Sequence, residues 1–149
     1  MKVITLWQPY ATAIALGLKR IETRGWRTHY RGILAIHAAG RSPDLSDLSP
    51  ALLNRLRAGA GGSFPSGQIV AVVTLADCVP SAAVRLLYPR RINATELALG
   101  SFGPGRWAWI LSDVIAIEPI VYRSRQGLHD LPTTTEKALR SVLLRRQYL

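Results

Sequence analysis

The sequence predicts an α+β fold, a small and mostly antiparallel β-barrel of about six strands with peripheral helices. Two observations predict it. Extended apolar segments recur along the 149 residues, with helical segments inserted between them. These segments do not follow the regular strand–helix–strand order that indicates a parallel, doubly wound sheet. Because the chain has no internal repeat, linker or low-complexity segment, it is expected to form one domain over residues 1–149.

The N-terminal segment has the pattern of a strand, a helix and a tight turn. Val3–Leu6 is apolar, as a buried strand would be, and Pro9 suits the first turn of a helix. Tyr10–Leu16 is apolar and rich in alanine, which indicates a short buried helix. Gly17 suits the left-handed conformation that commonly follows a helix. The chain is therefore expected to leave this turn as a second strand.

That second strand carries the candidate site. Because side chains alternate along a strand, Ile21 and Thr23 are expected on one face and Glu22 and Arg24 on the other. Lys19 precedes the strand, and its long stem can swing toward Glu22. A lysine, a glutamate and an arginine can thus line one cleft. A solvated strand face, with weak ion pairs of no more than about 1 kcal/mol each, accounts for the same residues and stays open.

The third predicted strand, Tyr30–Ala38, is mostly apolar and contains His37. A histidine in such a segment serves either as a hydrogen-bonded core residue or as a general acid or base. The sequence has no second histidine at an informative spacing from it. His37 is therefore kept as a candidate catalytic residue beside Lys19 and Glu22.

The rest of the chain supplies further strands and helices. They are a helix over Ala51–Arg57, a strand over Gln68–Asp77, helices over Ser81–Leu87 and Asn93–Leu99, strands over Arg106–Leu111 and Ile115–Tyr122, and a helix over about 134–147. The last helix starts at Thr133–Glu136, which matches a capping box. It is expected to turn leucine and valine inward and Arg140, Arg145 and Arg146 outward.

The charge balance points to an anionic partner. Nineteen Lys and Arg residues against nine Asp and Glu give a net charge of +10. Most of these cations are arginine, whose planar guanidinium suits phosphates and stacks on bases. Nucleic acid is therefore the leading partner class. A high genomic GC content would also enrich arginine, and this alternative explains the same composition.

Several other classes of protein are not expected. The apolar runs are too short to span a bilayer and no signal peptide is visible, so we expect a cytoplasmic protein without membrane contact. Cys78 is the only cysteine, which excludes an intrachain disulfide. The histidines and Cys78 lack metal-ligand spacing, and no phosphate-cradling loop or dinucleotide fingerprint is present. We therefore expect neither a metal nor a cofactor.

Five blocks of the sequence carry a family resemblance. They are Thr5–Ala11, Gly17–Arg24 with Trp26, Tyr30–Gly32 leading to Ile36–Ala38, Gly105–Trp109, and Gln126–Leu128. On these blocks the chain resembles the ASCH domain family of the PUA-like superfamily, and the Gly-x-Lys-x-x-Glu-x-Arg block is specific to it. The resemblance implies a small PUA-like β-barrel with a helix beside a positively charged cleft, and a role connected with RNA.

The resemblance also implies which residues form the cleft. In this sequence they are Lys19, Glu22 and Arg24 in the cleft, Trp7, Gln8, Arg106 and Gln126 at its walls or rim, and Trp26 just beyond. Two positions depart from the family. Glu22 stands where an amidohydrolase branch, which deacetylates N4-acetylcytidine, has a functional threonine. His129 stands where members often have tryptophan.

Three functions follow as hypotheses. The first is an RNA-binding module for single-stranded RNA or a modified nucleotide, in which aromatic side chains stack on a base, Glu22 accepts from its exocyclic amine, and Arg24 and Lys19 hold phosphate. The second is hydrolysis in the same cleft, as a ribonuclease or an amidohydrolase on N4-acylated cytidine, with Lys19, Glu22 and His37 as candidates. The third is a protein-interaction module that uses the basic C-terminal helix.

Overall fold

The computed structural model describes residues 1–41 and 44–147. In chain order the elements are β1 (Lys2–Leu6), α1 (Tyr10–Ala15), β2 (Ile21–Arg24), β3 (Gly32–Ala38), α2 (Pro50–Gly59), β4 (Gln68–Pro80), the 3₁₀ turn η1 (Ser81–Ala83), α3 (Val84–Leu87), the 3₁₀ turn η2 (Pro89–Arg91), α4 (Ala94–Ala98), β5 (Trp107–Val121), β6 (His129–Asp130) and α5 (Thr133–Gln147). The α+β class expected from the sequence is confirmed.

The six strands form one mixed sheet in the order β2-β5-β4-β3-β1-β6. β1 and β3 pair in parallel, with Val3 opposite Ala35, whereas the remaining neighbours pair antiparallel. Among the described residues β2 and β6 are the two edges and do not meet, so the sheet is open. The expectation of a mostly antiparallel barrel was wrong, because the sheet is mixed, with one parallel pair among its antiparallel ones, and does not close. The parallel pair arises because β2, which follows β1 in the chain, pairs with β5 at the far edge of the sheet. β3 therefore returns beside β1 and runs in the same direction.

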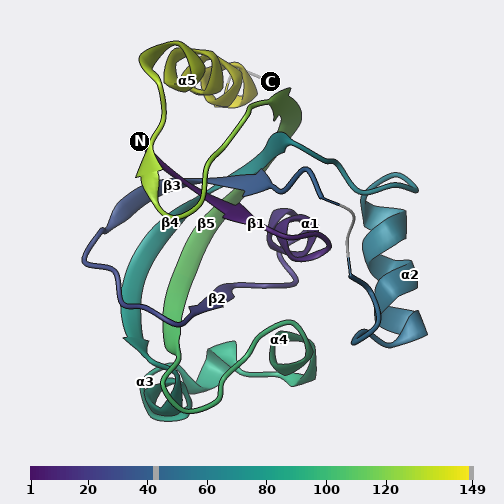
Figure 1. Cartoon of the computed structure of the whole chain (residues 1–149), viewed down its shortest axis with the longest axis vertical. Helices are drawn as coiled ribbons and strands as arrows, with labels where there is room; N and C mark the ends of the chain where they lie inside the picture. Colours follow the sequence, from purple (N-terminus) through teal and green to yellow (C-terminus); the bar gives the residue numbers. More distant parts are fainter. Residues whose placement is uncertain (42–43, 148–149) are drawn as a thin grey trace.

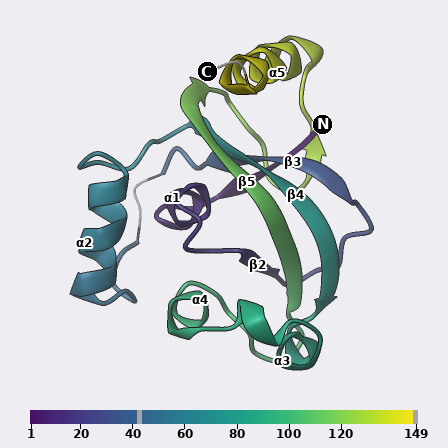
Figure 2. The same cartoon turned by 180° about the vertical axis from the view of Figure 1, so that it is seen from behind.

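Two long strands curve the sheet around a helix. Figures 1 and 2 show β4 and β5 running through the middle, α1 inside the curve, and α5 and α3 at opposite ends. β5 is continuous through residues expected to separate two strands, and Asp113 within it has a φ of 52°. Its register against β4 shifts at three places, as β-bulges do. Bulges increase local twist, which accounts for the curvature.

The core lies between α1 and the concave side of the sheet. Ala11 and Ile14 of α1 pack with Leu34, Val73 and Trp109, all of them buried. Gly17 ends this segment with a φ of +75°, as the sequence predicted. The helix thus packs on the sheet, and the turn at Gly17 leads the chain into the edge strand β2.

α5 covers a second cluster on the other side of the sheet. Leu139 is fully buried against Val3 and Ile69, and Val142 and Leu143 pack on the same cluster, which confirms their predicted inward positions. Arg140, Arg145 and Arg146 are exposed, as expected. The side chain of Glu136, expected in a capping box, instead accepts from the N-terminal ammonium of Met1 at 2.7 Å and from Arg140. None of the helices in residues 1–41 and 44–147 has the length and apolar character needed to cross a membrane.

Candidate functional site

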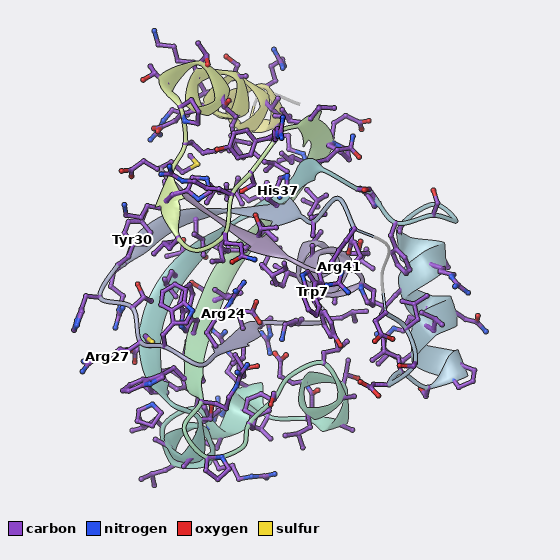
Figure 3. All side chains as sticks on the ribbon, viewed as in Figure 1. Trp7, Arg24, Arg27, Tyr30, His37 and Arg41 are labelled. Atoms are coloured by element: carbon purple, nitrogen blue, oxygen red, sulfur yellow. The ribbon has the colours of Figure 1, made fainter. Side chains whose placement is uncertain are left out.

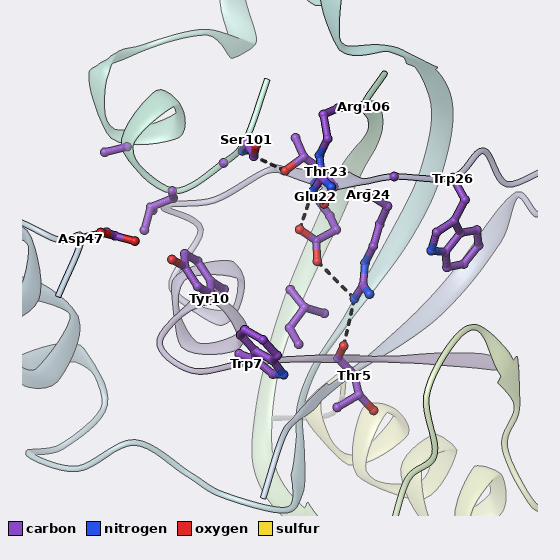
Figure 4. Close-up of a pocket in the computed structure, with 15 residues that line it drawn as sticks. Thr5, Trp7, Tyr10, Glu22, Thr23, Arg24, Trp26, Asp47, Ser101 and Arg106 are labelled. Atoms are coloured by element: carbon purple, nitrogen blue, oxygen red, sulfur yellow. Dashed lines mark hydrogen bonds and ion pairs between the residues drawn. The ribbon is translucent and has the colours of Figure 1, made fainter. Parts of the chain in front are cut away.

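A cavity of about 670 Å³ opens between β2, the turn from β1 into α1, and the segment that precedes β5 (Figure 4). We call it the first chamber. Its lining is Thr5, Leu6, Trp7, Tyr10, Glu22, Thr23, Arg24, Gly25, Trp26, Asp47, Ala98, Leu99, Gly100, Ser101 and Arg106. Four of the cleft residues implied by the resemblance are thus brought to the first chamber together with Trp26: Trp7, Glu22, Arg24 and Arg106.

The carboxylate of Glu22 is held in place inside the first chamber. The side chain of Glu22 is on the partly exposed face of β2, as strand alternation predicted. Its Oε1 accepts from the backbone N–H of Thr23 at 2.9 Å and lies 3.8 Å from Lys19 Nζ, and its Oε2 lies 3.4 Å from Arg24 Nη2. Because two cations and an N–H fix this group, it offers a hydrogen-bond acceptor at a defined position.

Lys19 supports Glu22 from behind. Its side chain is only 1% exposed, and its Nζ donates to the backbone carbonyls of Ile21 at 2.6 Å and Leu99 at 2.8 Å. Burial lowers the pKa of Lys19, although Glu22 and Glu96 nearby oppose this shift. The predicted convergence of Lys19, Glu22 and Arg24 therefore takes a different form, in which Glu22 and Arg24 line the first chamber and Lys19 lies beneath its wall.

Arg24 joins two strands that are not neighbours in the sheet. Its Nη2 donates to the backbone carbonyl of Thr5 in β1 at 2.9 Å, while Arg106 donates through Nη2 to the backbone carbonyl of Thr23 at 3.0 Å. The Nε atoms of both arginines are buried and have no hydrogen-bond partner among the described residues. Two guanidinium groups therefore contribute positive charge to the wall of the first chamber.

Two indoles with exposed surface flank these polar groups. Trp7 is 54% exposed and Trp26 is 40% exposed, and in the view of Figure 4 Arg24 lies between them. Trp26 is supported by an edge-to-face contact with the fully buried Trp109, at 4.8 Å between ring centroids. The guanidinium of Arg41 lies 3.9 Å from the ring centroid of Trp7, beside it in Figure 3. Exposed aromatic surface next to a fixed acceptor is suited to planar, polar ligands.

The hydroxyl of Tyr10 adds a donor to the first chamber. Burial, together with the nearby carboxylates of Asp47, Asp44 and Glu22, raises the pKa of Tyr10, so its phenol stays protonated at neutral pH. From the sequence, Tyr10 was placed at the start of a short buried helix. It does pack against the core, and its ring also reaches the chamber.

A second cavity of about 890 Å³ adjoins the first. This second chamber is lined by Thr5, Trp7, Arg24, Trp26, His37, Ala39, Gly40, Arg41, Gly67, Tyr122, Arg123, Ser124, Arg125, Gln126 and Gly127. Gln126, implied as a rim residue, and His37, a candidate catalyst, lie here and not in the first chamber. Sequence reasoning did not assign Arg41, Arg123 or Arg125 to the site. The only signal for the last two is their position just before the family block at Gln126.

Both ring nitrogens of His37 contact protein atoms. Nε2 lies 2.6 Å from the backbone carbonyl of Tyr122, so this nitrogen carries the proton, and Nδ1 lies 3.1 Å from the Thr5 hydroxyl oxygen. Burial lowers the pKa of His37, which favours this neutral form. Thr5 Oγ1 also lies 2.7 Å from Ser124 Oγ. The geometry makes His37 an anchor for the loop of residues 122–128.

Gln8 is placed away from both chambers. It is 2% exposed, its Nε2 donates to the backbone carbonyl of Pro65 at 2.9 Å, and its Oε1 accepts from the backbone N–H of Thr12 at 2.9 Å. These bonds hold the start of α1. Among the described residues, no three His, Cys, Asp or Glu side chains are grouped so that they could hold a metal ion.

An α+β fold with a basic, aromatic-lined cleft defines the class of protein expected from the sequence motifs, and comparison with known protein families identifies that class. The family model described as the ASCH domain matches residues 4–121. This chain belongs to the ASCH domain family, as its sequence motifs predicted. The solved structure of ASCH from Zymomonas mobilis superposes with a TM-score of 0.59 at 19% identity, over 95% of this chain and 94% of that one. A tyrosine-to-phenylalanine variant of that protein gives 0.59 at 20% identity, over 95% and 96%.

The chain is also similar to activating signal cointegrator 1. It is 33% identical to the mouse protein and 32% identical to the human protein, in each case over 91 residues. The match covers 58% of this chain and 16% of each relative. The chain therefore corresponds to a small part of these longer proteins.

Proposed function

We propose that this ASCH domain binds single-stranded RNA and holds one unstacked base in the first chamber. The observation that carries the proposal is the fixed carboxylate of Glu22 beside the exposed indoles of Trp7 and Trp26. Proteins read single-stranded RNA by stacking its bases on aromatic side chains and by hydrogen bonds to base edges. The first chamber supplies both kinds of contact at one place.

The charges around the chamber favour the same ligand. The chain carries a net charge of +10, which attracts polyanions at long range. Arg24 and Arg106 add positive charge at the wall of the chamber itself. Because arginine pairs with phosphate through a planar fork, these side chains suit the sugar–phosphate backbone that accompanies a bound base.

The hydrogen-bonding groups restrict the base. Glu22 accepts hydrogen bonds and the protonated hydroxyl of Tyr10 donates one. A base that carries an exocyclic amine next to a ring acceptor, such as adenine or cytosine, matches this pair, and a cytosine acylated on N4 keeps one N–H. Uracil offers only its ring N3–H as a donor on this edge, and the two carbonyl oxygens that flank this N–H would face the carboxylate of Glu22 unfavourably. We therefore infer a preference for amino bases over uracil.

Hydrolysis in the same chamber is supported less well. Lys19 lies beneath the wall, and its amine is engaged by two backbone carbonyls and approached by Glu22. Glu22 is itself held by Arg24. Both groups are arranged to hold the chamber in shape, so we favour binding over turnover by a ribonuclease or an amidohydrolase.

The basic C-terminal helix α5 is also a weaker candidate for the binding surface than the cleft. Arg140 pairs with Glu136 at 2.8 Å, and Arg146 donates to the backbone carbonyl of Ala116. Two of its three arginines are thus engaged within the chain, which weakens the case for α5 as the main contact with a protein partner.

Fluorescence anisotropy with labelled oligonucleotides tests the proposal. Single strands of adenosine, cytidine and uridine, and their DNA counterparts, are titrated at a low and a high salt concentration. We expect salt-dependent binding with adenosine or cytidine preferred over uridine. Glu22→Gln, which keeps the shape and removes the charge, should reduce this preference about five-fold, because a hydrogen bond to a charged acceptor is stronger by about 1 kcal/mol.

The matched control is Glu118→Gln, because Glu118 is an exposed glutamate outside both chambers. It makes the same change of net charge and should leave the base preference as it is. The proposal fails if the protein does not bind RNA even at low salt. It also fails if Glu22→Gln and Glu118→Gln behave alike.

A further inference from the structure

The two chambers are compartments of one cleft. Both are lined by Thr5, Trp7, Arg24 and Trp26, so the two indoles and one guanidinium form the boundary between them. Their volumes of about 670 and 890 Å³ are each in the range of cavities that bury a small ligand. A ligand that fills the first chamber can therefore continue into the second past Trp7.

The second chamber differs from the first in its charge. The first chamber contains Glu22 and Asp47 together with its arginines, so its charges are mixed. The second is lined by Arg24, Arg41, Arg123 and Arg125, and no aspartate or glutamate of the described chain lines it. A strongly positive cavity beside a mixed one suits a ligand with a polar, uncharged part next to an anionic part.

The cations of the second chamber are available to a ligand. Arg123 and Arg125 are exposed, and within residues 1–41 and 44–147 neither has an ion-pair partner. Arg41 lies on the ring of Trp7, which holds its guanidinium at the boundary between the chambers. Arg24 is already engaged, by Glu22 and the backbone of Thr5.

The wall that carries Arg123 and Arg125 is anchored to the first chamber. His37 bonds the backbone carbonyl of Tyr122, and Thr5 joins His37 to Ser124 through its hydroxyl. The backbone carbonyl of the same Thr5 accepts from Arg24. One residue thus ties the two chambers together, and the backbone that carries Arg123 and Arg125 is anchored to the strand of Thr5.

We propose that the second chamber is a phosphate subsite, which binds the phosphodiester that links the base in the first chamber to its neighbour. This inference rests on the proposed function, and it gives the cleft a footprint of two nucleotides. Arginine forks recognise phosphate oxygens bidentately, and the carboxylates of Glu22 and Asp47 make the first chamber less favourable for a phosphate than the second. The ligand class is therefore a single-stranded dinucleotide unit with its base at Glu22 and its phosphate at Arg123 and Arg125.

Titrations of ¹⁵N-labelled protein with adenosine, cytidine and their dinucleotides ApA and CpC test this assignment. The indole N–H signals of Trp7 and Trp26, which line both chambers, report occupancy of the cleft for each ligand. We expect the dinucleotide of the preferred base to bind more tightly than its nucleoside. Arg123→Gln combined with Arg125→Gln should weaken dinucleotide binding about ten-fold or more and leave nucleoside binding unchanged, because only the phosphate contacts are removed.

The control combines Arg55→Gln with Arg85→Gln, two exposed arginines outside both chambers, which makes the same change in net charge. Thermal unfolding establishes that both double variants are folded. If the two double variants bind the dinucleotide equally well, the phosphate subsite is wrong while the base chamber stands. If neither nucleosides nor dinucleotides shift the indole signals of the unmodified protein, the proposed function and the subsite both fail.

Discussion

Lys19 and Leu99 are joined by a hydrogen bond of 2.8 Å between a buried ammonium and a backbone carbonyl that is distant in the sequence. The same ammonium bonds the carbonyl of Ile21 and lies 3.8 Å from Glu22. Lys19 therefore ties β2 to the end of α4 and supports the floor of the first chamber. Its role is to hold the shape of the site.

Replacing Lys19 with methionine is expected to destabilise the fold by about 3 kcal/mol, because two buried carbonyls lose their donor and Glu22 loses a cation. Urea denaturation measures the change in the free energy of unfolding. Lys137→Met is the matched control, since Lys137 is exposed on α5 and its replacement should alter stability by no more than about 0.5 kcal/mol. Equal stability of the two variants would contradict the supporting role.

The burial of Lys19 also shows where sequence reasoning ends. Strand alternation was sufficient to put Glu22 and Arg24 on one face of β2, because the period of a strand is local. The hydrogen bond from Lys19 to the backbone carbonyl of Leu99 joins residues far apart in the sequence, and no local sequence pattern predicts it. Lys19, which was expected at the surface of the cleft, is therefore buried beneath it.

The arrangement of the strands was limited in the same way. Most of the segments were predicted, since hydrophobic period and turn residues are local signals, but β5 was expected as two strands and β6 was not expected. The pairing of strands depends on contacts between segments that meet only in the folded chain. The parallel pair of β1 and β3 is an example. The second chamber was missed for this reason, because Arg41 and Arg123 come from segments far apart in the sequence.

Glu96 should make stability depend on pH. Its Oε1 accepts from the backbone N–H of Arg20 at 2.6 Å, and its buried Oε2 has no hydrogen-bond partner in the described part of the chain. Burial raises the pKa of Glu96 above its ordinary value of 4.5. The folded state thus binds this proton more tightly than the unfolded state, so the stabilising contribution is complete below 4.5 and is lost as pH rises through the folded pKa.

Glu96→Gln removes this titration while keeping an oxygen for the N–H of Arg20. We expect the variant to gain in free energy of unfolding relative to the unmodified protein as pH rises above 4.5 and the buried carboxyl of Glu96 ionises. Urea denaturation at several pH values measures the difference. Glu118→Gln, at an exposed position, serves as the reference. A constant difference between Glu96→Gln and the unmodified protein across this range would show that the carboxyl is not perturbed.

His37 should titrate below its ordinary pKa of 6.5 because burial disfavours the imidazolium. The backbone carbonyls of Tyr122 and Gly67 oppose this shift, and His129 nearby adds to it. Since the folded pKa is depressed, the stabilising contribution of His37 is complete above 6.5 and is lost as pH falls through the folded pKa. The anchor of the loop of residues 122–128 should weaken in the same interval.

NMR titration of the imidazole C–H signals measures this pKa directly, and the signal missing from His37→Gln assigns it. We expect a midpoint below 6.5 for His37. The backbone amide signals of residues 122–128 should change with the same midpoint. A midpoint at or above the ordinary value, or loop signals that do not follow it, would remove the anchoring role.

Trp7 should contribute to binding by stacking and not by charge. It is 54% exposed and is shared by both chambers, so its replacement with alanine removes aromatic surface from the cleft at little cost to the fold. Loss of one stacked base is worth about 1 to 3 kcal/mol, so RNA affinity should fall about five-fold to 150-fold. The slope of affinity against salt concentration should stay the same, because no phosphate contact is removed. Trp7→Phe, which keeps a ring, should recover part of the affinity, and anisotropy titrations in which Trp7→Ala binds as tightly as the unmodified protein would exclude Trp7 as a stacking surface.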